Sequence, residues 1–123
     1  MRSTRDAIRE GLARVWGSGG REFVTFELAD GGRTDPDRWV QWLEGDVNLR
    51  WPLDEDPRTA LLRLGAAPPP GAVVGFHTPG GNACVHALDA RIDDVAEFID
   101  RVFRRVLGAP SRYEVEVRVE RHA

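Results

Sequence analysis

Residues 39–51 read WVQWLEGDVNLRW, and this stretch predicts a β-hairpin. Aromatic and β-branched residues, which favour strands, fill the segments on both sides of Glu44-Gly45-Asp46. In the second segment apolar residues alternate strictly with polar ones, namely Val47, Leu49 and Trp51 with Asn48 and Arg50. Side chains of a strand point alternately to its two faces. One face of this strand is therefore expected to be apolar and the other to face water.

The segment before the hairpin predicts a helix and a further strand. Apolar residues recur at helical spacing over residues 4–16, and Ser3 or Thr4 can cap the start of this helix. Residues 22–29 have the aromatic and β-branched content of a strand. Residues 30–37 are rich in Gly, Asp and Pro, so we expect a loop that joins this strand to the hairpin.

The remaining elements follow the hairpin in sequence. They are a helix over about 57–64, strands over 72–77 and 82–88 around a turn at 78–81, a helix over 92–107 and a strand over 112–120. The complete order is αβββαββαβ. Runs of consecutive antiparallel strands separated by helices predict an α+β fold, with an antiparallel sheet and helices packed on one face. Residues 1–123 are expected to form a single domain.

Composition narrows the classes of partner. The chain has 17 basic and 20 acidic residues, and this net charge of -3 argues against binding to a nucleic acid backbone. No apolar run approaches the ~20 residues that span a bilayer, so we expect no membrane segment. The N-terminus lacks the apolar core of a signal peptide, and Cys84 is the only cysteine. These features predict a cytoplasmic location.

The second hairpin carries the best candidates for chemistry, which are His77, Cys84 and His86. With a turn centred on Pro79-Gly80, all three share the more polar face of the hairpin. The two histidines are then roughly 13 Å apart along the strands, which is too far for one metal ion. A pair of Cys84 with one histidine remains conceivable, but no orienting third group is apparent. The alternative to a reactive pair is a solvated strand face with a partly covered thiol, and we favour this alternative. We therefore expect no catalytic site, no metal and no cofactor.

The tryptophans suggest a binding surface. Trp39 and Trp42 have opposite parity in one strand, so at least one should lie outside the main core. Such an indole can anchor a partner, or it can be covered by the first helix or by the 30–37 loop. Our candidates for partner binding lie on the exposed apolar side of the first part of the sheet: Phe23, Trp39 and Trp51, with Arg50 at the rim.

Over about residues 4–108 the sequence resembles TY-Chap domains, which share the fold of type III secretion chaperones. The resemblance is carried by Trp39-Val40-Gln41-Trp42, by the stretches 47–53 and 61–69, and by the 92–107 helix with its Gly108-Ala109-Pro110 exit. It departs from the family pattern in the 30–37 loop and in the added strand at 112–120.

The resemblance implies a small acidic homodimer that binds an extended segment of another protein, such as a secreted effector or a toxin, without chemistry or a cofactor. Two other functions stay open at this point. One is an immunity or inhibitor protein that binds a folded toxin. The other is a small enzyme that uses Cys84 with His77 or His86.

Overall fold

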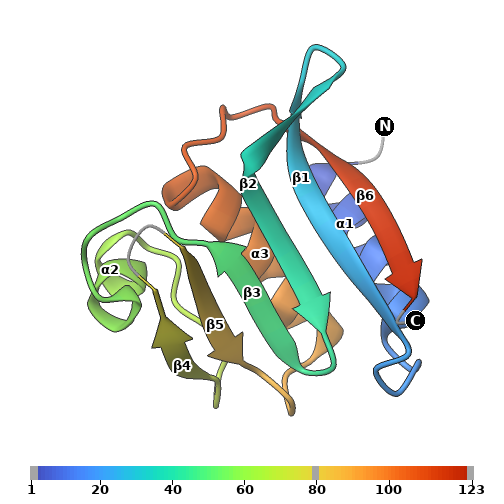
Figure 1. The fold of residues 1–123 in the computed structure, drawn as a ribbon, viewed down its shortest axis with the longest axis horizontal. Coiled ribbons are helices and arrows are strands. Elements are labelled where there is room, and N and C mark those ends of the chain that lie inside the picture. The colour runs from blue at the N-terminus through green and yellow to red at the C-terminus, as the bar shows by residue number, and fades with distance from the viewer. Residues whose placement is uncertain (1–2, 79–80, 122–123) are drawn as a thin grey trace.

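The computed structural model describes residues 3–78 and 81–121, and its six strands form one antiparallel sheet (Figure 1). The elements are α1 (Thr4–Val15), β1 (Glu22–Asp30), β2 (Arg33–Leu43), β3 (Asp46–Arg50), α2 (Pro57–Arg63), β4 (Val73–His77), β5 (Asn82–His86), α3 (Ile92–Arg105) and β6 (Glu114–Arg121). The strand order across the sheet is β4-β5-β3-β2-β1-β6. The predicted α+β class and element order are confirmed.

Helices α1 and α3 lie side by side behind the sheet in Figure 1, and they cover one of its two faces. Every second residue of the central strands points into the resulting core, which contains Val24, Phe26, Leu28, Val40, Trp42, Val47 and Leu49. The inner side of α3 adds Val95, Ile99, Val102 and Phe103. No helix stands in front of strands β3, β2, β1 and β6 in Figure 1. The face that these strands turn away from the helices is called the open face below.

The N-terminal helix begins and packs through specific local contacts. Ser3 caps α1 and forms a reciprocal capping box with Asp6, as the predicted cap at Ser3 or Thr4 allowed. Gly11 lets the helix approach the sheet closely, because a Cβ at this position would lie 2.8 Å from the Phe26 ring and 2.9 Å from Val117. These contacts fix α1 over β1 and β6.

The expectation of a loop over residues 30–37 is wrong for most of that segment. Gly31 and Gly32 have φ values of +59° and +83°, and they form a two-residue turn between the paired residues Asp30 and Arg33. The register then breaks between the Ala29–Thr34 and Glu27–Trp39 pairs. Residues 35–38 therefore lie in an irregular part of β2 beside the projecting hairpin tip (Figure 1).

The second hairpin differs from the predicted register by one residue. Val73 pairs with His86 as expected, but His77 pairs with Ala83 instead of Asn82, because the register shifts between Val74 and Phe76. The predicted turn centre at residues 79–80 lies outside the described residues. Strand β5, not β4, pairs with β3, so the second hairpin docks onto the first through its later strand.

None of the helices within residues 3–78 and 81–121 combines the length and the apolar character that crossing a bilayer requires.

Candidate functional site on the open face of the sheet

Three cross-strand rows of side chains make up the centre of the open face. The ladders place Phe23 beside Glu120, Thr25 beside Gln41 and Arg118, and Glu27 beside Trp39 and Glu116. Thr25 is buried although the helices of the described residues lie on the other face, and its hydroxyl accepts a hydrogen bond from the Gln41 side-chain amide at 3.3 Å. The middle row is thus polar and closely packed, with an apolar group on either side of it.

Trp39 and Trp42 point to opposite faces of the sheet, which confirms the prediction from their parity. Trp42 is buried in the core and stacks on Trp16, which directly follows α1. Trp39 is half-buried and lies outside the core. Trp39 is therefore the tryptophan of this strand that a partner can reach.

Trp51 is not a surface residue, and its assignment to the exposed side of the sheet is wrong. Its side chain is fully buried, and its indole Nε1 donates a hydrogen bond of 2.9 Å to the carbonyl oxygen of Glu55. Its parity matches that of Val47 and Leu49, which also point into the core. Trp51 is a folding residue that ties the end of β3 to the segment before α2.

Phe23 and Arg50 do lie on the open face, together with Leu43. All three side chains are half-buried. Val40 and Leu49 are paired in the antiparallel β2–β3 ladder. The next residues on one side of this pair are Trp39 in β2 and Arg50 in β3, so their side chains lie next to each other. Phe23 and Leu43 lie beside each other next to the Val24–Trp42 pair of the β1–β2 ladder, and they form a second apolar group.

Acidic side chains outnumber basic ones on the open face. The set comprises Glu27, Asp46, Glu114, Glu116 and Glu120 against Arg50 and Arg118. Arg118 forms ion pairs with both Glu27 and Glu120 and so compensates part of this charge. The surroundings of the two apolar groups remain acidic.

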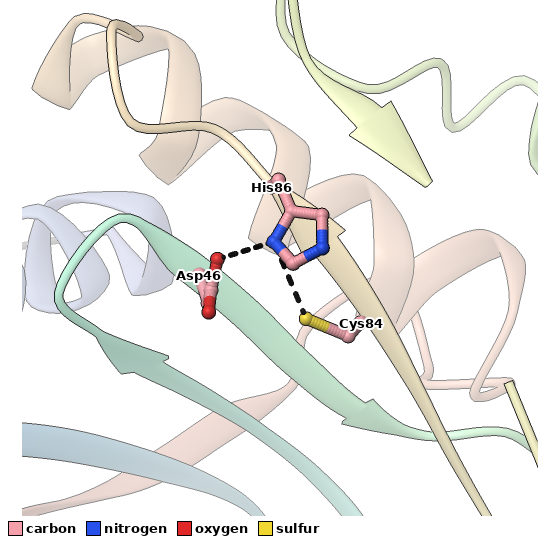
Figure 2. Close-up of side chains that lie close together, drawn as sticks. All are labelled: Asp46, Cys84 and His86. Atoms are coloured by element: carbon pink, nitrogen blue, oxygen red, sulfur yellow. Dashed lines mark hydrogen bonds and ion pairs between the residues drawn. The ribbon is translucent and has the colours of Figure 1, made fainter. Parts of the chain in front are cut away.

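The structure brings Cys84 and His86 together and adds a third group, Asp46, that sequence reasoning missed. Figure 2 shows Cys84 and His86 from β5 and Asp46 from β3 with their side chains pointing toward one another. The His86 Nδ1 atom lies 2.7 Å from Asp46 Oδ1 and 3.9 Å from Cys84 Sγ. One ligand atom from each residue can be chosen so that all three lie within 4.8 Å of one another. The geometry therefore collects three different metal-ligand types at one point.

Local backbone structure explains the positions of these side chains. Glu44 and Gly45 have φ values of +45° and +87° and form a two-residue turn that starts β3 at Asp46. The β3–β5 ladder then pairs Asp46 directly with His86, and Cys84 lies two residues away on the same face. His77 belongs to another level of the hairpin, opposite Ala83, and the structure describes nothing of its side chain.

Gly75 provides the space that the His86 ring occupies. A Cβ built on Gly75 would lie only 2.2 Å from His86 Nε2. The imidazole thus rests over the backbone of β4 with Nδ1 turned toward Asp46 and Cys84. Any side chain at position 75 would displace the ring.

The thiol in this arrangement is not prepared for nucleophilic attack. Cys84 is 2% exposed, and burial, followed by the negative charge of Asp46, raises the pKa of its thiol to about 11. A catalytic imidazole joins its nucleophile and its orienting carboxylate through different ring nitrogens. Here both neighbours approach Nδ1, so Asp46 and Cys84 compete for one atom instead of forming a relay.

Comparisons with protein-family models, curated proteins and solved structures found no match to this chain.

Proposed function

We propose that this protein is a non-enzymatic protein-binding module, and that its open face holds an extended segment of another protein in the cytoplasm. The observation that carries the proposal is Trp39, a half-buried indole on the face that the helices leave uncovered. An indole supplies a large rigid apolar area at low cost in side-chain entropy, which is why tryptophan is frequent among residues that dominate binding energy.

The spacing of the apolar groups suits an extended occupant. Trp39 and Leu43 are four residues apart in β2, or roughly 13 Å at ~3.3 Å per residue. An extended segment places its side chains i and i+4 on the same side at the same spacing. One apolar side chain of the segment would contact Trp39, and the other would contact Phe23 and Leu43.

The charge of the face favours a basic occupant. Glu27 and Glu116 are paired across the β1–β6 ladder, and Asp46 and Glu120 lie on the same face. A Lys or Arg between the two apolar side chains of the segment would lie over the polar row of Thr25 and Gln41, and its long side chain would reach the carboxylates of the rows on either side. This attraction raises the rate of association and disfavours acidic competitors. The proposed client segment is thus extended, with two apolar side chains and a basic side chain between them.

Labelled synthetic peptides of this design test the proposal by fluorescence anisotropy. The test peptide carries two Leu four residues apart with Arg between them, and the comparison peptides replace either the Arg with Glu or both Leu with Ser. We expect the test peptide to bind and the Trp39→Ala variant to lose about tenfold or more in affinity. Leu62→Ala is the matched control, because Leu62 is 66% exposed on α2, away from the open face.

Equal affinity of the wild type for all three peptides would reject the proposed occupant. Equal loss of affinity in Trp39→Ala and Leu62→Ala would reject the proposed site. Failure of all three peptides to bind would also oppose the proposal. This result is expected if the client binds the open face as a folded domain, which no peptide can replace.

A further inference from the structure

We propose that Asp46, Cys84 and His86 form a binding site for a single Zn²⁺ ion with one coordination position open to solvent. This inference is independent of the proposed client, because it concerns a bound ion and needs no protein partner. It rests on the convergence of three side chains, from two strands, that offer a carboxylate oxygen, a thiolate sulfur and an imidazole nitrogen (Figure 2).

The separations of the donor atoms are close to those of a tetrahedral site. Zinc takes sulfur at ~2.3 Å and nitrogen or carboxylate oxygen at ~2.0–2.2 Å, which puts tetrahedral donor atoms about 3.3–3.6 Å apart. The distance between Cys84 Sγ and His86 Nδ1 is 3.9 Å, and that between His86 Nδ1 and Asp46 Oδ1 is 2.7 Å. The third pair, Cys84 Sγ and a carboxylate oxygen of Asp46, lies within 4.8 Å, so each pair would shift by little more than ~1 Å on metal binding.

The donor set selects the class of ion. Thiolate and imidazole ligands suit zinc and related transition metals, whereas calcium and magnesium require mainly oxygen ligands. Binding of Zn²⁺ would form one bond to each of the three donor atoms and release the thiol proton of Cys84 to solvent. His86 would coordinate through Nδ1 in its neutral form, with its remaining proton on Nε2.

The surroundings hold the ligands and leave access for the ion. Cys84 is buried in the sheet. The His86 ring packs against the backbone at Gly75, where a side chain would displace it. The side chains of His86 and Asp46 are 50% and 40% exposed, so the fourth tetrahedral position faces solvent and takes a water molecule. Three protein ligands and one water are the pattern of an open zinc site.

Metal titration of the untagged full chain, reduced and freed of metal by a chelator, tests the site. Zn²⁺ is titrated calorimetrically, and Co²⁺ is used as a spectroscopic probe because a cobalt–thiolate bond gives a charge-transfer absorption. We expect one equivalent of each metal to bind, and Zn²⁺ to abolish the cobalt–thiolate absorption. An absence of saturable binding, or Co²⁺ binding without the thiolate absorption, would overturn the proposal.

Variants assign the ligands. We expect Cys84→Ser to remove the thiolate absorption, and His86→Ala and Asp46→Asn each to weaken Zn²⁺ binding by at least about 10- to 100-fold, since even the loss of outer-shell partners has that effect. His86 and Asp46 lie at the surface, so these two variants remain informative if Cys84→Ser fails to fold. Gly75→Ala should weaken binding by displacing the His86 ring, although position 75 supplies no ligand atom.

Two matched controls separate this site from general metal binding by surface groups. His77→Ala removes a histidine from the neighbouring strand, at another level of the ladder, and Asp89→Asn removes an exposed carboxylate after β5. Both variants should bind Zn²⁺ with wild-type affinity. Equal weakening by His77→Ala and His86→Ala would overturn the assignment of the site.

Discussion

Trp16 and Trp42 stack face to face, with ring centroids 4.6 Å apart and ring planes 7° from parallel. The stack joins the residue after α1 to the middle strands of the sheet, on the face that the helices cover. Trp39, three residues before Trp42, lies on the opposite face. The same strand therefore carries one tryptophan that holds the fold and one that is available to a partner.

Replacing these two tryptophans should have different effects on stability. Trp42→Ala removes a buried, stacked ring, and we expect it to lower the free energy of unfolding by about 3–5 kcal/mol. Trp39→Ala should cost less than about 2 kcal/mol, because its ring is only half-buried. Urea unfolding of the two variants measures both values. Comparable losses would show that Trp39 also belongs to the core.

Gly11→Ala should destabilise the protein although alanine is the better helix former. The exchange gains about 1 kcal/mol of helix propensity. It also forces a Cβ to within 2.8 Å of the rigid Phe26 ring and 2.9 Å of Val117, and overpacking of this kind costs about 1–3 kcal/mol. We expect a net loss of stability in thermal or urea unfolding. Gly17→Ala is the control, because a Cβ there meets no atom within 4 Å, and it should not lower stability.

The buried thiol of Cys84 should make stability fall at alkaline pH. Its pKa is raised from 9.0 to about 11, first by burial and then by the charge of Asp46. Between these values the unfolded chain loses the thiol proton while the folded chain keeps it, which favours unfolding. The stabilisation is thus complete below about pH 9 and is lost as the pH rises toward about 11.

Unfolding of the metal-free protein in urea at about pH 8 and about pH 10.5 measures this effect. Wild type should lose more stability over that interval than Cys84→Ala, which lacks the thiol. The difference between the two proteins isolates Cys84, because Tyr113, whose pKa is also raised by burial and by Asp100, contributes equally to both. The same pH dependence in both proteins would contradict the prediction.

We expect the protein to form a homodimer in solution. Strand β6 ends the sheet and pairs only with β1 in the described strand order, so its outer edge can pair with a second copy. Light scattering after size exclusion at micromolar concentration should give about twice 13.7 kDa. A constant mass of one chain across a dilution series would count against this assembly.

Local sequence patterns predict the order of the elements and the faces that residues of the regular strands occupy. Capping at Ser3, the helical period over 92–107 and the alternation in 47–51 are local patterns, and the observed helices and strands follow them. The opposite orientation of Trp39 and Trp42 also follows from the period of a strand. The local patterns did not predict the turn at Gly31-Gly32. Composition indicates a loop over residues 30–37, but the two glycines adopt positive φ and connect the strands by themselves.

How the two predicted hairpins join is a property of the tertiary structure, and the metal-ligand cluster depends on it. Asp46 meets His86 because β3 pairs with β5, and no feature of the sequence specifies this pairing over one with β4. The one-residue shift near Gly75 likewise arises where β4 meets β5, and it moves His77 out of its predicted register. Trp51 is buried, contrary to its predicted place at the surface, and its parity matches that of the core residues Val47 and Leu49; its indole bonds to the carbonyl oxygen of Glu55, four residues further on. Contacts between strands and loops distant in sequence are set by packing of the whole core, which local periodicity does not encode.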